Sequence, residues 1–218
     1  YRAVGLGPAA GQGWYTANKD EDVCTTMDRL GTVPFVAQPG EAWVYGYNTD
    51  ILGCIVQRVS GQALDAFIRT RLTAPLGMAH TFFFVPPTLR DQLTAVYRSD
   101  SSGRSVRADD GIMGQGTYVE GPRRNFAGGA GLISTAHDYA RFLQMLLNGG
   151  EYDGKRYLSA ATFKDMTTDH VGKDSGIARD YLYFPGDGFG FGYGFAVRTD
   201  PKTIAGEIQI VARELKWD

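Results

Sequence analysis

The sequence lacks two motifs that commonly carry a nucleophilic serine. None of its serines lies in a Gly-x-Ser-x-Gly pentapeptide, and none is followed three positions later by lysine. Its three histidines, His80, His137 and His170, lie apart from clusters of cysteine or aspartate at metal-binding spacing. We therefore expect no complete serine active site, no metal and no cofactor within these 218 residues.

The sequence also lacks an excess of charge and a long apolar run. It has 22 basic and 24 acidic residues, and the basic ones are scattered singly or in pairs such as Arg123-Arg124, which disfavours a nucleic-acid partner. The longest apolar stretch, residues 141–147, is amphipathic and far shorter than the ~20 residues of a membrane-spanning helix. With 43% hydrophobic and 21% charged residues, the composition predicts a globular protein of one large domain or two small ones.

Cysteine is scarce, since only Cys24 and Cys54 are present. They could pair, but two free buried thiols of an intracellular enzyme are the expected state. On this ground a cytoplasmic location is favoured over a periplasmic or secreted one, although two cysteines do not fix the compartment. The sequence begins at Tyr1 without signal-peptide features and ends at Asp218 in strand-like sequence, so we expect it to be a piece of a larger protein.

Helical periodicity is the clearest pattern that is present. Residues 48–60 have it, with Asn48 as a capping residue and Gly61 as the stop, and residues 62–72 repeat it. Two further helices are predicted, one that follows Ser134 or Thr135 and ends at Asn148-Gly149-Gly150, and a shorter one at residues 159–167.

Strand-like sequence comes late in the chain. Residues 82–124 are rich in Gly, Pro, Ser and Asp, which predicts an extended excursion over the surface, such as a rim or lid, and no core elements. Beyond Gly186, aromatic and apolar residues alternate with small ones from Phe189 to Val197, which predicts one half-buried strand.

The most informative segment is residues 38–53, which contains Tyr45. A turn at Pro39-Gly40 followed by an aromatic residue just before a helix can place a phenol oxygen beside the positive end of the helix dipole, which favours its ionised form. Tyr45 could then act as a base. Physical reasoning alone favours the alternative that Tyr45 is an ordinary aromatic residue in a turn, as most tyrosines are.

Several motifs, spaced in the right order, give the chain a resemblance to the serine β-lactamase-like superfamily of penicillin-recognising enzymes. The resemblance is closest to class C β-lactamases and family VIII carboxylesterases. The motifs are Pro39-Gly40, Trp43-x-Tyr45-Gly46, Asp50-x-Leu52-Gly53, Ser60-Gly61, Pro75-Leu76-Gly77-Met78 with Thr81-Phe82, Gly128-Gly129-Ala130-Gly131-Leu132-x-Ser134-Thr135-Ala136-x-Asp138-Tyr139-Ala140 and Leu146-Leu147-Asn148-Gly149-Gly150.

The resemblance implies an α+β fold of the β-lactamase/transpeptidase type, incomplete in this chain. Residues 1–185 would form the mainly helical part with the tyrosine loop, and residues 186–218 the first returning strands of the antiparallel sheet. The N-terminal sheet and the Ser-x-x-Lys segment with the nucleophile would lie before Tyr1. A companion chain could carry that segment, and this chain alone is expected to be inactive.

The resemblance also implies a function, the hydrolysis of carboxylic esters through an acyl-enzyme. Tyr45 would be the catalytic base for acylation and the acid for the leaving group. Tyr47 stands where the β-lactamases have the asparagine of Tyr-x-Asn, and Asn48 comes one residue late, so both are substrate-binding candidates and the departure favours an esterase. Trp217 would take the first position of the family's Lys-Thr-Gly motif as a substrate-side residue, unless Lys216 does and Trp217 is a core aromatic.

Other functions remain open on the sequence. The substrate could be a lactam, as for a β-lactamase, or a peptide, as for a D-alanyl carboxypeptidase. A catalytically dead relative that serves as a binding module is a further alternative. The segment Gly128–Gly131 could need positive φ angles or close approach near the site, or it could be a flexible entry to the helix after it.

Overall fold

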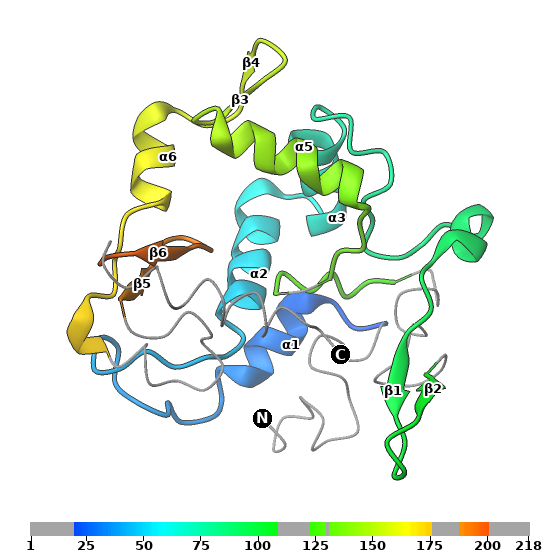
Figure 1. Cartoon of the computed structure of the whole chain (residues 1–218). Helices are drawn as coiled ribbons and strands as arrows, with labels where there is room; N and C mark the ends of the chain where they lie inside the picture. Colours follow the sequence, from blue (N-terminus) through cyan, green and yellow to red (C-terminus); the bar gives the residue numbers. More distant parts are fainter. Residues whose placement is uncertain (1–19, 109–122, 130, 176–187, 201–218) are drawn as a thin grey trace. The chain divides into compact units, whose positions relative to one another are not determined.

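The computed structural model describes residues 20–108, 123–129, 131–175 and 188–200 (Figure 1). These residues divide into two compact units. The first contains the chain up to Pro34 together with Tyr47–Phe142, and the second contains Phe35–Gly46 together with the chain from Leu143 onward. Both units combine helices with short antiparallel strands, which agrees with the predicted α+β class.

The first unit begins with two helices, α1 (Val23–Leu30) and α2 (Asn48–Ser60). Helix α1 was not predicted, although the Asp22 side chain caps it by accepting a hydrogen bond from the Cys24 N–H at 2.8 Å. Helix α2 was predicted, and it ends as expected at Gly61, whose φ of 68° suits glycine. Its start differs, because Asn48 is already helical and Tyr47 stands at the capping position without a side-chain cap bond.

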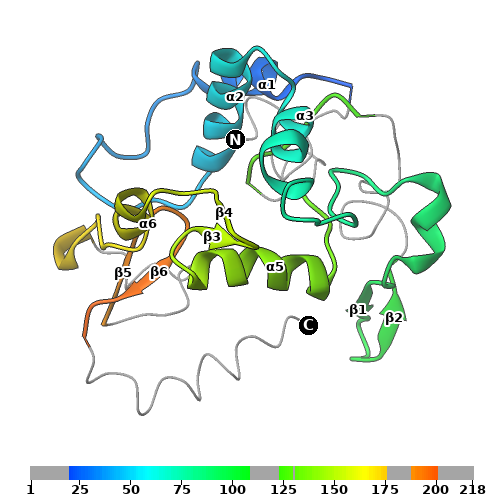
Figure 2. The ribbon, with the colours of Figure 1, turned by 90° about the horizontal axis from the view of Figure 1, so that it is seen from above.

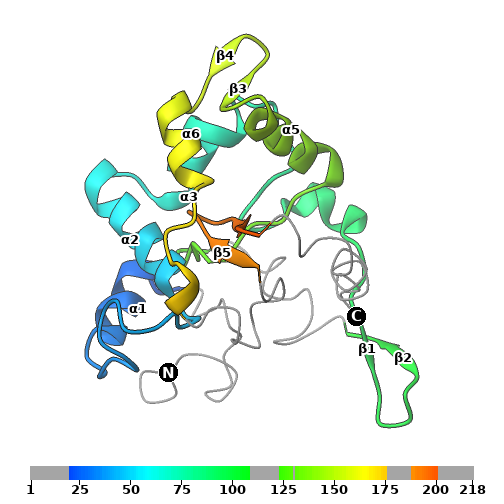
Figure 3. The ribbon, with the colours of Figure 1, turned by 60° about the vertical axis from the view of Figure 1, so that its left-hand side comes forward.

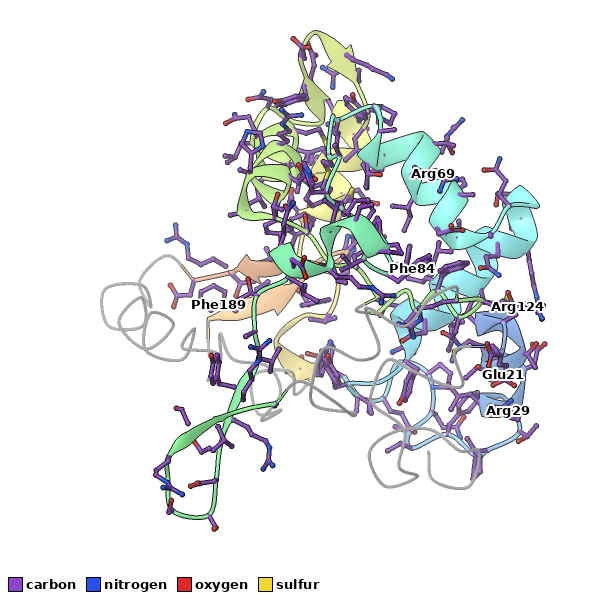
Figure 4. All side chains as sticks on the ribbon, turned by 90° about the vertical axis from the view of Figure 1, so that its right-hand side faces the viewer. Glu21, Arg29, Arg69, Phe84, Arg124 and Phe189 are labelled. Atoms are coloured by element: carbon purple, nitrogen blue, oxygen red, sulfur yellow. A yellow bond between two sulfur atoms is a disulfide. The ribbon has the colours of Figure 1, made fainter. Side chains whose placement is uncertain are left out.

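A disulfide between Cys24 and Cys54 joins α1 to α2, so the expectation of two free thiols is wrong. The two cysteines are separated by 30 positions in the sequence, but packing of the helices brings their Cα atoms to 4.9 Å, within the range of a disulfide. Val23, Met27 and Tyr47 form a buried cluster with Cys54 beside this bond. On the outer side of α1, Glu21 and Arg29 form an ion pair (Figure 4).

A second buried cluster lies around helix α3 (Leu64–Ile68), which continues as one π-helical turn, η3 (Arg69–Thr73). Leu64 packs with Phe83 and Phe126, whose ring centroids are 5.2 Å apart. Phe83 and Val85 are buried, so the prediction that residues 82–124 carry no core elements is wrong for the start of this segment. The next elements agree with the predicted surface excursion. They are the short helix η4 (Pro87–Gln92) and an exposed hairpin of β1 (Tyr97–Ser99) and β2 (Ser105–Arg107).

The predicted third helix is α5 (Ala136–Leu147), and it ends at glycines 149 and 150, which have φ angles of 67° and 95°. The Thr135 hydroxyl caps it by accepting from the Asp138 N–H at 3.1 Å. The Asp138 carboxylate, only 2% exposed, accepts from the His80 N–H at 2.7 Å and the Thr81 hydroxyl at 3.0 Å. One buried carboxylate therefore joins two of the sequence motifs that are far apart along the chain.

The second unit contains a hairpin, a helix and a second hairpin (Figure 2). Strands β3 (Glu151–Tyr152) and β4 (Lys155–Arg156) are connected by a turn in which Asp153 and Gly154 both have positive φ. The predicted short helix is confirmed as α6 (Ala160–Met166), with the Ser159 hydroxyl accepting from the Thr162 N–H at 3.0 Å.

Residues 189–198 form two antiparallel strands, β5 (Phe189–Phe191) and β6 (Ala196–Arg198), so the prediction of a single strand is wrong (Figure 3). The turn between them depends on glycine. Gly194 has a φ of 83°, and a Cβ on Gly192 would lie 2.2 Å from the Met166 carbonyl oxygen. The boundary predicted at residue 185 lies outside the described residues and stays a prediction.

Among the described residues, no single helix is long and apolar enough to cross a bilayer. Helices Asn48–Ser60 and Leu64–Thr73 reach the required length and composition only as a pair, and that pair is bent by 81°.

Candidate functional site

The predicted catalytic residue, Tyr45, lies in the second unit, and its side chain is 44% exposed. Its ring is tilted against that of Trp43, with the centroids 6.1 Å apart. Trp43 is in turn held on two sides. The backbone N–H of Trp43 donates a hydrogen bond to the Ser175 carbonyl oxygen at 3.0 Å. The Trp43 ring contacts the Phe191 ring edge-on, with the ring centroids 6.1 Å apart. The backbone is therefore fixed two residues before an accessible phenol.

The Asp169 carboxylate supports this arrangement through hydrogen bonds to the backbone. It accepts hydrogen bonds from the N–H groups of Val171, Phe191 and Gly172, at 3.1, 3.0 and 3.2 Å. Partial burial acts to raise the pKa of this carboxyl group, but the three N–H donors and the nearby His170 together hold the pKa below its ordinary value. Asp169 is therefore ionised and bound to three backbone amides near neutral pH.

The two substrate-binding candidates of the first unit have different environments. Asn48 is exposed as the first residue of α2, whereas Tyr47 is only 6% exposed and lies in the cluster with Val23, Met27 and Cys54. Tyr47 and Asn48 belong to the first unit and Tyr45 to the second, and Trp217 lies outside the part of the chain that the structure describes. The roles of all four residues stay predictions.

A buried carboxylate in the first turn of α2 belongs to Asp50, which the sequence places in a motif but without a predicted role. Asp50 is 4% exposed, and its Oδ1 accepts from the Gly129 N–H at 3.2 Å. Burial raises the pKa of this carboxyl group, against the lowering effect of the N–H groups of Gly129, Asp50 itself and Gly128. An acidic residue in a first helical turn is a recognisable signal, so Asp50 could have been found from the sequence.

The glycines of the 128–131 segment allow its backbone to lie very close to neighbouring residues. A Cβ on Gly128 would lie 2.2 Å from the Thr49 carbonyl oxygen, and one on Gly131 would lie 2.7 Å from the Phe83 ring. Gly128, Gly129 and Gly131 do not have positive φ angles. The segment approaches the start of α2 closely, and the expectation that this approach lies near the catalytic site stays a prediction.

A metal centre would need several ligating side chains in one place. Within the described ranges, no group of three or more His, Cys, Asp or Glu side chains could hold a metal ion.

Comparison with known proteins places the chain in a family. A family model described as Beta-lactamase matches residues 3–209. An uncharacterized protein of Mycobacterium tuberculosis is 39% identical over 79% of this chain and 42% of its own length. The lovastatin esterase of Penicillium rubens is 30% identical over 87% of this chain and 45% of its own length. The chain thus spans less than half the length of these curated relatives.

A similarity in structure extends over most of the chain. EstCE1, a hydrolase with promiscuous acyltransferase activity, matches 93% of this chain and 51% of its own with a TM-score of 0.73. At 23% sequence identity this match shows the fold alone, which is of the predicted β-lactamase/transpeptidase type. Because the family match covers nearly the whole sequence and the fold agrees with it, this chain belongs to the Beta-lactamase family.

Proposed function

We propose that this chain is part of a serine hydrolase that cleaves carboxylic esters through an acyl-enzyme, with Tyr45 as its acid-base residue. The family is one of serine hydrolases, which include esterases and β-lactamases. The observation that carries the proposal for this chain is the placement of Tyr45, whose phenol is accessible while its neighbour Trp43 is fixed by a backbone bond and a ring contact.

The proposed nucleophile is the serine of a Ser-x-x-Lys segment outside this sequence. Its hydroxyl oxygen attacks the ester carbonyl, and the proton passes to Tyr45 with the help of the lysine. As the tetrahedral intermediate collapses, the Tyr45 hydroxyl returns a proton to the departing alcohol oxygen, and water then releases the acid from the acyl-serine. Trp217 is proposed to line the substrate side of this site.

Ester substrates are favoured over lactams because of the residue at position 47. β-Lactamases of this family use an asparagine amide at that place to contact the substrate, and here the side chain is a tyrosine that packs in the buried cluster of the first unit. A buried aromatic ring offers no carboxamide to a lactam. The similarity to the lovastatin esterase supports the same direction.

The test is Tyr45→Phe in the protein that contains this chain together with the Ser-x-x-Lys segment. Removal of an acid-base group should lower kcat for p-nitrophenyl butyrate by about 10²- to 10⁴-fold. Tyr97→Phe is the matched control, since Tyr97 is 56% exposed on β1, and it should keep the wild-type rate.

An unchanged kcat in Tyr45→Phe would refute the role of Tyr45. Faster turnover of nitrocefin than of the ester would favour a β-lactamase. Ester turnover by these 218 residues alone, abolished by Tyr45→Phe, would refute a nucleophile outside this sequence and with it the need for a companion chain.

A further inference from the structure

Both supports of Trp43 lead to one carboxylate. The ring support is Phe191, and its N–H donates to Asp169 Oδ1 at 3.0 Å. A second hydrogen bond joins the segment that contains Asp169 to strand β5, because the His170 backbone N–H donates to the Phe191 carbonyl oxygen at 2.9 Å. Asp169 therefore holds strand β5 at the residue that contacts the tryptophan ring.

The backbone support of Trp43 is Ser175, at the end of the short helix η5 (Lys173–Ser175). The turn before this helix starts at Gly172, whose N–H donates to Asp169 Oδ2 at 3.2 Å. The Gly172 carbonyl oxygen accepts from both the Ser175 N–H, at 3.3 Å, and the Ser175 hydroxyl, at 2.8 Å. The same carboxylate thus sets the turn that ends in the carbonyl group bound by Trp43.

The strand is built to let this carboxylate in. A Cβ on Gly190 would lie 2.1 Å from Asp169 Oδ1, so only glycine leaves room for the bond to the next residue, Phe191. Gly190 is buried between two partly buried phenylalanines, Phe189 and Phe191 (Figure 4 labels Phe189). The Asp169 carboxylate therefore holds strand β5 in place, which a solvated surface charge would not do.

We propose that Asp169 is a positioning residue for Tyr45. By holding Phe191 and the turn that ends at Ser175, its carboxylate fixes Trp43 on two sides, and through Trp43 it sets where the phenol stands. This inference rests on the proposed function of Tyr45, and it adds a residue, 124 positions away in the sequence, on which the rate depends.

The test is a double-mutant cycle between Asp169→Ala and Tyr45→Phe in the protein that also contains the Ser-x-x-Lys segment. A small displacement of a catalytic group can cost up to about 10²-fold in rate, so we expect Asp169→Ala to lower kcat by about 10- to 100-fold and to leave KM within about threefold. In the Tyr45→Phe background the same change should lower kcat less than about twofold, because its effect passes through the phenol.

Two further variants separate positioning from a general loss of structure. Asp169→Asn keeps one oxygen to accept from Val171 and Phe191 but puts an NH2 donor opposite the Gly172 N–H, so it should restore part of the kcat that Asp169→Ala loses. Glu151→Ala is the control, since this carboxylate of the same unit pairs with Arg156 on the hairpin of β3 and β4, and the variant should keep the wild-type kcat.

Equal effects of Asp169→Ala with and without Tyr45 would overturn the inference, and so would an Asp169→Asn variant as slow as Asp169→Ala. If Asp169→Ala does not fold, Gly190→Ala takes its place in the cycle, since its methyl group would displace the carboxylate. If Tyr45→Phe keeps the wild-type kcat, the proposed function fails first. If Tyr45→Phe is slow and Asp169→Ala is not, only the inference on Asp169 fails.

Discussion

Among the described residues, the contacts that stabilise the two units differ in kind. In the first, the Cys24–Cys54 disulfide and two buried apolar clusters join α1, α2 and α3. In the second, the described contacts are largely hydrogen bonds from backbone N–H groups, above all those to Asp169, together with edge and tilted contacts between aromatic rings. Apolar contacts are not directional in the way hydrogen bonds are, so the described part of the second unit depends more on individual polar atoms.

Two aspartates make this difference concrete. Asp50 and Asp169 both accept hydrogen bonds from backbone N–H groups of glycine-containing loops. The pKa of Asp50 is nevertheless raised, because this side chain is 4% exposed and loses its hydration, whereas the pKa of Asp169, which is only partly buried, is lowered by its three donors. Both carboxylates are bound by backbone N–H groups, so the difference in burial decides which of the two is stabilised as an ion.

The largest expected effect concerns the disulfide. Replacing both Cys24 and Cys54 with serine should destabilise the first unit by about 3–4 kcal/mol, as expected for a cross-link that closes a loop of this size. Native-state hydrogen exchange should show faster exchange at the amides of α2, with little change at those of β5. A reducing agent added to the wild-type protein should reproduce the result. Equal acceleration in both units would show that they unfold together and would break the comparison.

A smaller effect is expected from two glycines, one in each unit. In both Gly128→Ala and Gly192→Ala the new Cβ would lie 2.2 Å from a backbone carbonyl oxygen, of Thr49 and of Met166 respectively. Overpacking against the backbone should cost about 1–3 kcal/mol in each case, measured by urea unfolding. Gly31→Ala is the control, because the nearest atom would lie at 3.3 Å. Hydrogen exchange should place each loss in its own unit, and a loss shared by both would count against separate stabilisation.

The smallest expected effect is a pH dependence of stability, to which Asp50 in the first unit and Asp169 in the second contribute with opposite signs. Asp50 holds its proton more tightly in the folded chain, so the stability that Asp50 contributes to the first unit should be lost as pH rises from the ordinary aspartate range through the raised pKa. Asp169 binds its proton less tightly when folded, so the second unit should keep its stability above that range and lose it as pH falls through the lowered pKa.

These two slopes can be separated by residue-resolved unfolding in urea between about pH 3 and pH 6. Asp50→Asn should remove only the contribution of Asp50, and Asp169→Asn only that of Asp169, because Glu21 and Asp100 of the first unit, whose pKa values are lowered, keep their own contributions. Changes of slope with the same sign in the two variants would contradict the assignment of burial as the deciding factor.

The later helices and the family could be predicted from the sequence alone. The end of α2, the start and end of α5 and the start of α6 depend on caps and glycines within a few positions, such as Ser159 and Gly61, and these act locally. Helix α1 carried the same kind of signal in Asp22 and was overlooked. The family could be recognised because its motifs are short and keep their order along the chain, and the match over residues 3–209 agrees with them.

Only the tertiary structure decided which distant residues meet. The sequence predicted two free thiols at Cys24 and Cys54, and only the packing of α1 against α2 brings them close enough to form a disulfide. The alternation from Phe189 to Val197 suits one strand or two, and the close approach of Gly192 to Met166 selects the hairpin. Asp169 shows no distinctive pattern in the sequence, because its importance comes from Phe191, 22 positions later. Caps and periodicity act within a turn of the chain, whereas burial, cross-links and anchoring carboxylates depend on neighbours that only folding supplies.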